Sequence, residues 1–88
     1  MKWPEVRQAY PNRWLIVEAL KAHNTGNQRE LDQLAVVEEC VDGSDSFQRY
    51  QDLHQRYPER ELYFVHTSRE RLEILERQWL GIRLDHAN

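Results

Sequence analysis

Hydrophobic positions gather in separate runs along the 88-residue chain, and their spacing predicts most of the secondary structure. Residues 14–20 (WLIVEAL) are apolar at both parities, which is typical of a strand that is covered on both faces. Residues 61–66 (ELYFVH) predict a second strand. Residues 31–42 (LDQLAVVEECVD) fit a helix or a strand, and their β-branched pair favours a strand. The polar segment 22–30 predicts a hairpin loop, so we expect a sheet centred on residues 14–20.

Two helices are predicted beside these strands. Pro4 suits the first turn of a short helix, in which Val6 and Tyr10 share one apolar edge. A longer helix is expected to begin near Ser44 or Asp45, because either side chain can accept a hydrogen bond from the first free amides. The apolar face of this helix is expected to pack on the sheet. Its members recur at helical spacing and are followed by Pro58: Phe47, Tyr50, Leu53, His54 and Tyr57.

The segment 69–80 has two interpretations. Ser68 is a suitable N-cap, and a helix would place Leu72, Leu75, Trp79 and Ile82 on one side. The alternative is a strand that forms a hairpin with residues 61–67. With either choice we expect an α+β fold: a small antiparallel sheet with helices packed on it, in the order α-β-β-α-β, followed by this contested element. Residues 1–88 are expected to form a single compact domain.

The charge distribution argues against nucleic-acid binding. The chain has 12 basic and 15 acidic residues, a formal net charge of −3. Phosphate recognition normally requires a concentrated basic face, and none is evident. Residues 30–45 instead form an acidic run with no basic residue, which is either a solvated strand face or a surface for a basic partner. The acidic residues of this run are Glu30, Asp32, Glu38, Glu39, Asp42 and Asp45.

Other classes of function find no support in the residue pattern. The single cysteine, Cys40, rules out an internal disulfide and a multi-thiolate metal site, and it is expected to be a small buried hydrophobe. No glycine-rich phosphate loop and no apolar stretch near 18 residues is present. We therefore expect a cytoplasmic protein without a cofactor, metal or membrane segment. The four histidines lack metal-ligand spacing: His23, His54, His66 and His86.

The two ends of the chain carry a recognisable pattern of motifs. The chain opens with Met1-Lys2-Trp3, followed by Tyr10-Pro11 and Trp14, and closes with His66-Thr67-Ser68 and Gly81-Ile82-Arg83. Taken together, these motifs resemble those of a family of small, uncharacterised bacterial proteins. The resemblance spans nearly the whole chain. It implies a free-standing bacterial domain, and it implies no activity, cofactor or partner.

Two candidate sites lie in the last third of the chain. The candidate binding residues are His66, Ser68, Arg69, Trp79 and Arg83. Among them, Trp79 and the two arginines combine a large aromatic side chain with guanidinium groups, as interface centres often do. This pattern favours a non-enzymatic protein-binding or assembly module that uses this C-terminal surface or a sheet edge. The partner is either an unknown protein or a second copy of the chain. The alternative is a small hydrolase-like enzyme, because His66 and Ser68 point the same way on a strand and could act as base and nucleophile.

Overall fold

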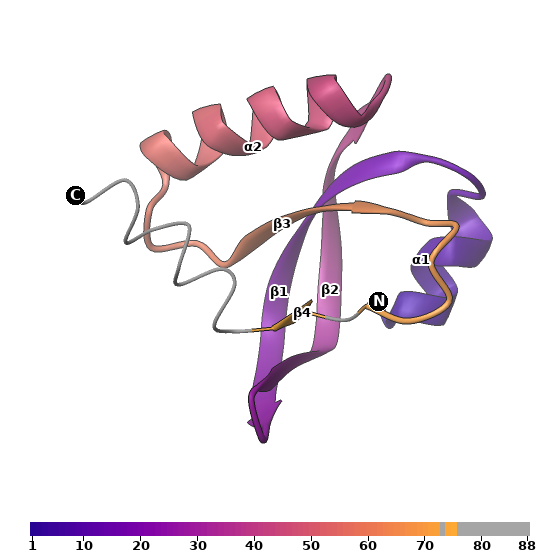
Figure 1. Ribbon diagram of the computed structural model, residues 1–88, viewed down its shortest axis with the longest axis vertical. Helices are drawn as coiled ribbons and strands as arrows, with labels where there is room; N and C mark the ends of the chain where they lie inside the picture. Colours follow the sequence, from indigo (N-terminus) through magenta and orange to yellow (C-terminus); the bar gives the residue numbers. More distant parts are fainter. Residues whose placement is uncertain (73, 76–88) are drawn as a thin grey trace.

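The computed structural model describes residues 1–72 and 74–75 (Figure 1). The fold is α+β, with helices packed on an antiparallel sheet of strand order β3-β1-β2-β4. The predicted order α-β-β-α-β is confirmed. In chain order the elements are α1 (Trp3–Ala9), β1 (Trp14–Thr25), β2 (Gln28–Cys40), α2 (Gly43–Arg56), β3 (Leu62–His66) and β4 (Ile74–Leu75).

β1 lies inside the sheet, and its first half is buried on both faces. Leu15 and Val17 belong to one hydrophobic cluster, which Trp3 of α1 covers. Ile16, between them, belongs to a second cluster, which Tyr50 of α2 covers. Successive side chains of a strand point to opposite faces. Both faces are covered here, so all three strand residues are 0% exposed. The expected coverage on both sides is confirmed, with α1 and α2 on opposite faces.

β1 and β2 form a hairpin that is longer than the sequence pattern indicated. The strands continue through the predicted loop to Thr25 and Gln28, and only Gly26 and Asn27 form the turn. Gly26 has a φ of +64°, which places the glycine at the first central position of a type II′ turn. The outer arms were mistaken for a loop because their side chains are mostly exposed and polar. The predicted strand at residues 31–42 is confirmed up to Cys40, where β2 ends.

α2 packs on the sheet largely as expected, with two corrections. Its N-cap is Asp42 and not Ser44 or Asp45: the Asp42 carboxylate accepts a hydrogen bond from the Asp45 amide at 2.8 Å. Tyr50 is buried, but Phe47 is 45% exposed and forms a T-shaped ring contact with Phe64 of β3. The fully buried residue of the first turn is Ser46, whose hydroxyl donates to the Gly43 carbonyl. The hydrophobic pattern did not predict the burial of Ser46, because this residue is polar and its hydroxyl is hydrogen-bonded within its own helix.

The contested segment begins with turns and is followed by a short strand. No helix begins at Ser68, because turns and bends extend to residue 72 and Ile74–Leu75 then form β4. β4 pairs with Gln28 and Arg29 of β2 and not with β3, so the expected hairpin partner was also wrong. At Ile74–Leu75, pairing with the distant strand β2 outweighed the helical spacing of Leu72 and Leu75. The remaining residues of this segment, 73 and 76–80, lie outside the described residues.

Thr67 ties the turn after β3 to the connection between α1 and β1. Its hydroxyl donates to the Tyr10 carbonyl at 2.6 Å and accepts from the Arg13 amide at 2.8 Å. Its own amide donates to the Arg13 carbonyl, and its carbonyl accepts from the Arg7 side chain, both at 2.9 Å. Thr67 is only 2% exposed, so these bonds are sheltered from water. They fix where the chain leaves β3 and crosses towards β2.

Candidate functional site

An open hollow of about 410 Å³ lies beside the outer edge of β2. One wall is β2 itself, a second is the segment 70–72, and the indole of Trp3 contributes from α1. Among the described residues of these walls, acidic side chains outnumber basic ones. The hollow is therefore both concave and negatively charged. Its lining residues are Trp3, Gln28, Glu30, Leu31, Asp32, Glu70, Arg71 and Leu72.

The hollow lies between two attachments to the same edge of β2. On one side, β4 pairs with Gln28 and Arg29. On the other side, the amino group of Met1 donates to the Leu34 carbonyl at 2.7 Å, and the Leu34 amide donates back to the Met1 carbonyl at 2.6 Å. Among the described residues, no strand pairs with the outer edge at residues 30–32. The edge is thus covered at both ends and hollowed in between.

Trp3 fixes the position of the opposite wall. Its indole Nε1 donates to the Arg69 carbonyl at 3.0 Å, and the ring is 8% exposed. Leu72, three residues further on, packs against the hydrophobic cluster that contains Trp3. These two contacts hold the intervening residues Glu70 and Arg71, which are exposed, beside the hollow.

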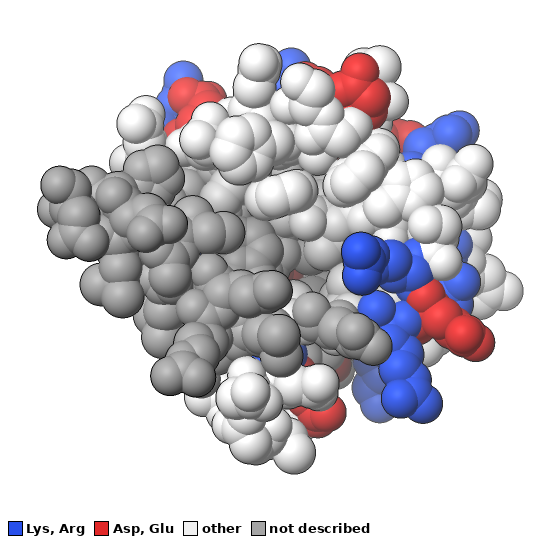
Figure 2. All heavy atoms as spheres, viewed as in Figure 1, with Lys and Arg blue, Asp and Glu red and all other residues white. Residues whose placement is uncertain are grey.

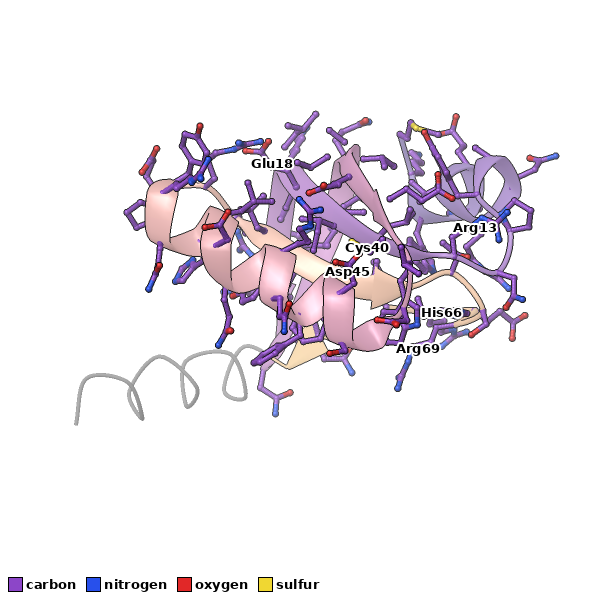
Figure 3. The ribbon with its side chains drawn as sticks, turned by 90° about the horizontal axis from the view of Figure 1, so that it is seen from above. Arg13, Glu18, Cys40, Asp45, His66 and Arg69 are labelled. Carbon is purple, nitrogen blue, oxygen red and sulfur yellow. The ribbon has the colours of Figure 1, made fainter. Side chains whose placement is uncertain are left out.

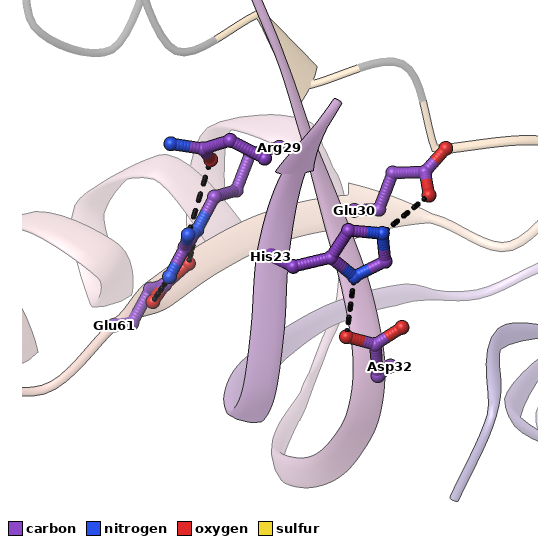
Figure 4. Close-up of polar contacts among 6 residues, drawn as sticks. His23, Arg29, Glu30, Asp32 and Glu61 are labelled. Atoms are coloured by element: carbon purple, nitrogen blue, oxygen red, sulfur yellow. Dashed lines mark hydrogen bonds and ion pairs between the residues drawn. The ribbon is translucent and has the colours of Figure 1, made fainter. Parts of the chain in front are cut away.

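His23 brings a titratable group to the same two carboxylates of β2. Its Nδ1 lies 2.7 Å from Asp32 Oδ2, and its Nε2 lies 3.1 Å from Glu30 Oε2 (Figure 4). The hydrogen bond to Asp32, reinforced by the charges of Asp32 and Glu30, raises the pKa of His23 above its ordinary value of 6.5. About half of the imidazole surface is exposed, so the pair of contacts lies within reach of solvent.

A second polar network braces the other face of the hairpin. The Arg29 guanidinium donates to both oxygens of the Glu61 carboxylate at 2.9 Å, as Figure 4 shows. The Tyr63 hydroxyl donates to the same carboxylate at 2.6 Å. Burial, and then the bond to Glu61, raises the pKa of Tyr63 above its ordinary value. This bidentate pair joins the outer arm of β2 to the start of β3 and stiffens the wall that carries Glu30.

His66 and Ser68, two of the predicted binding residues and the catalytic pair of the alternative hypothesis, do meet. Ser68 Oγ lies 2.7 Å from His66 Nδ1, and the Ser68 amide donates to the same nitrogen at 3.1 Å. Nδ1 is therefore the acceptor, and the hydroxyl donates to it. Nε2 has no hydrogen-bond partner among the described residues, and the ring meets the edge of Trp14 at 5.0 Å between centroids. Neither residue lines the hollow.

Arg69 lies at the same end of the sheet as His66 and Arg13 (Figure 3). On the face shown in Figure 2, the largest group of basic atoms lies at the end where Figure 1 places α1. Arg13 is paired with Glu39 at 2.8 Å, so its charge is partly neutralised. The structure thus brings His66, Ser68 and Arg69 into one turn. The other two predicted binding residues, Trp79 and Arg83, lie outside the described residues.

Sequence reasoning missed the hollow because its walls come from separate parts of the chain. Trp3, the hairpin arm at residues 28–32 and the segment 70–72 are brought together by contacts between distant parts of the chain, such as the bond from Trp3 to Arg69 and the pairing of β4 with β2. The one signal of the hollow in the sequence was the acidic run that begins at Glu30. One of the two interpretations of this run was a surface for a basic partner. The part of that run which lines the hollow is Glu30 and Asp32.

Three further observations narrow the chemistry. No group of three or more His, Cys, Asp or Glu side chains within residues 1–72 and 74–75 is arranged to hold a metal ion. No helix in the described part of the chain is long and apolar enough to cross a membrane. Cys40 is buried, and burial, followed by the charge of Asp45, raises the pKa of its thiol. A raised pKa disfavours the reactive thiolate, in agreement with the expected packing role.

No family model matches the chain, and neither does any curated protein or solved structure. Its function therefore has to be inferred from the geometry of the site.

Proposed function

We propose that the protein is a cytoplasmic, non-enzymatic binding module whose hollow takes a lysine- or arginine-rich segment of a partner protein. The observation that carries this proposal is the gathering of Glu30, Asp32 and Glu70 around one concavity, where Arg71 is the one cationic side chain among the described lining residues. A cationic side chain that enters there would meet carboxylate acceptors and the ring of Trp3, both of which attract positive charge.

The edge of β2 favours a foreign partner over a second copy of this chain. An extended segment that lies along residues 30–32 gains main-chain contacts, as strands added to sheet edges do. Two copies meeting through the same edge would place Glu30 and Asp32 of each copy close to those of the other, and like charges across strands are destabilising. A basic segment reverses the sign of this interaction.

The proposal is tested by the fluorescence anisotropy of a short labelled oligolysine peptide titrated with the protein. Glu30→Gln and Glu70→Gln should each weaken binding about two- to five-fold, since each removes one exposed charge pair. Glu59→Gln is the matched control, because Glu59 is also exposed but does not line the hollow. The affinity should fall as salt is added. Equal affinities for Glu30→Gln and Glu59→Gln would show that the peptide binds elsewhere.

The contact between Ser68 Oγ and His66 Nδ1 supports a second candidate, a hydrolase that uses Ser68 as nucleophile and His66 as base. We rank it lower because the two residues are only two positions apart, so the turn itself accounts for their contact, and Ser68 is exposed outside the hollow. Ester, phosphoester and peptide substrates should be screened. Turnover that disappears in both Ser68→Ala and His66→Ala, with unchanged unfolding midpoints, would establish this candidate.

A further inference from the structure

We propose that His23 is a built-in competitor for the hollow: its charged ring occupies Glu30 and Asp32, and its neutral ring releases one of them to a cationic partner. This inference rests on the proposed function and adds its regulation. The partner should bind more tightly as the pH rises through the range in which His23 loses its proton. The protein would thus hold its partner more tightly at alkaline pH and release it on acidification.

The geometry requires a charged ring for both contacts. His23 on β1 is directly opposite Glu30 on β2, and Asp32 lies two residues further along the same strand. One carboxylate faces each ring nitrogen, at 3.1 Å and 2.7 Å. Only the imidazolium form carries N–H groups on both nitrogens. A neutral ring keeps one N–H and turns a lone pair towards the other carboxylate, so one of the two contacts becomes repulsive and opens.

The freed carboxylate already lines the hollow. Both Glu30 and Asp32 belong to its wall, and His23 does not. Among the described residues, the other charged groups that line the hollow are Glu70 and Arg71, and Lys21 lies two positions before His23 on β1. Histidine is the side-chain type whose charge ordinarily changes between about pH 5 and 8. Loss of the His23 proton therefore makes the wall more negative by one charge, next to the position where a lysine of the partner would bind.

The experiment measures the affinity of labelled oligolysine for the full chain between about pH 6 and pH 9. The wild type should bind about five-fold more tightly at the upper end, the range expected for one exposed charge. The His23→Gln variant, which is uncharged throughout, should bind with an affinity that no longer changes over this range. His54→Gln is the control, because His54 lies on α2 and stacks on Tyr50, and it should retain the pH dependence.

A second measurement uses the reciprocity of linked equilibria. If loss of the proton favours the peptide, saturating peptide must lower the pKa of His23, which NMR reads from the imidazole resonances. A flat affinity in the wild type, or the same pH dependence in His23→Gln, overturns the role of His23 and leaves cation binding by the hollow intact. If oligolysine binds the wild type at no pH, the proposed function fails together with this inference.

Discussion

Leu15→Ala tests the claim that β1 is covered on both faces. Leu15 is 0% exposed and packs in the cluster beneath α1, so its truncation removes buried surface and leaves a cavity. Such changes cost about 3 to 5 kcal/mol when the surroundings cannot collapse. A chain of 88 residues has a total stability of about 4 to 13 kcal/mol at ordinary values per residue. The loss is therefore a large share of the total, and the melting temperature should fall by about 12 to 40 °C.

Leu20→Ala is the matched control, because it makes the same chemical change on the same strand. Leu20 is 62% exposed, and its truncation should cost less than about 0.5 kcal/mol. Urea unfolding followed by circular dichroism measures both variants, with similar m-values expected because each exposes nearly the same surface on unfolding. Equal losses for the two variants would refute the burial of Leu15 and with it the assignment of a core to the α1 face.

Three other changes test separate parts of the structure. Tyr63→Phe should lower the free energy of unfolding by about 1 to 2 kcal/mol, since it removes a buried hydrogen bond to the Glu61 carboxylate. Because the pKa of Tyr63 is raised, this variant should also lack the tyrosine that titrates last when absorbance is followed at alkaline pH. Gly26→Ala should cost about 1 kcal/mol in thermal unfolding, because φ is positive there, whereas Gly26→Asn should cost less. Asp42→Ala should lower the free energy of unfolding by about 1 kcal/mol, because it removes the N-cap of α2, whereas Ser68→Ala should lower it by less than about 0.5 kcal/mol. Chemical denaturation measures both variants, and a larger loss for Ser68→Ala would contradict the assigned cap.

The elements with strong local patterns were predictable from the sequence. Within the run at residues 14–20, Leu15, Ile16 and Val17 are apolar at both parities, and in the structure both faces of the strand are covered there, so the residue types indicate this burial directly. The outer arms of the hairpin and β4 were not predictable in this way. Their residues are polar or few, and they are strands because of the partners they meet: Gln28 and Arg29 pair with β4 across more than forty positions of sequence.

The candidate site divides along the same line. His66 and Ser68 were expected to point the same way, and their contact follows from a separation of two residues. The hollow depends on Trp3 meeting segment 70–72, a contact between opposite ends of the described chain that no local spacing records. Likewise, His23 was set aside because it lacks ligand spacing along the chain. Its carboxylate neighbours lie across a strand pair whose extent was underestimated.

The position of β3 has a consequence for how the chain folds during synthesis. β1 pairs early with β2, its neighbour in sequence, but its other edge pairs only with Leu62–His66, and Thr67 then closes the connection at Arg13. Until the ribosome has released residue 67, the backbone of the most apolar strand has one edge without its native partner. Exposed edges of this kind recruit other chains. A chain truncated before Leu62 should therefore aggregate, whereas one that ends shortly after Thr67 retains the pairing that protects β1.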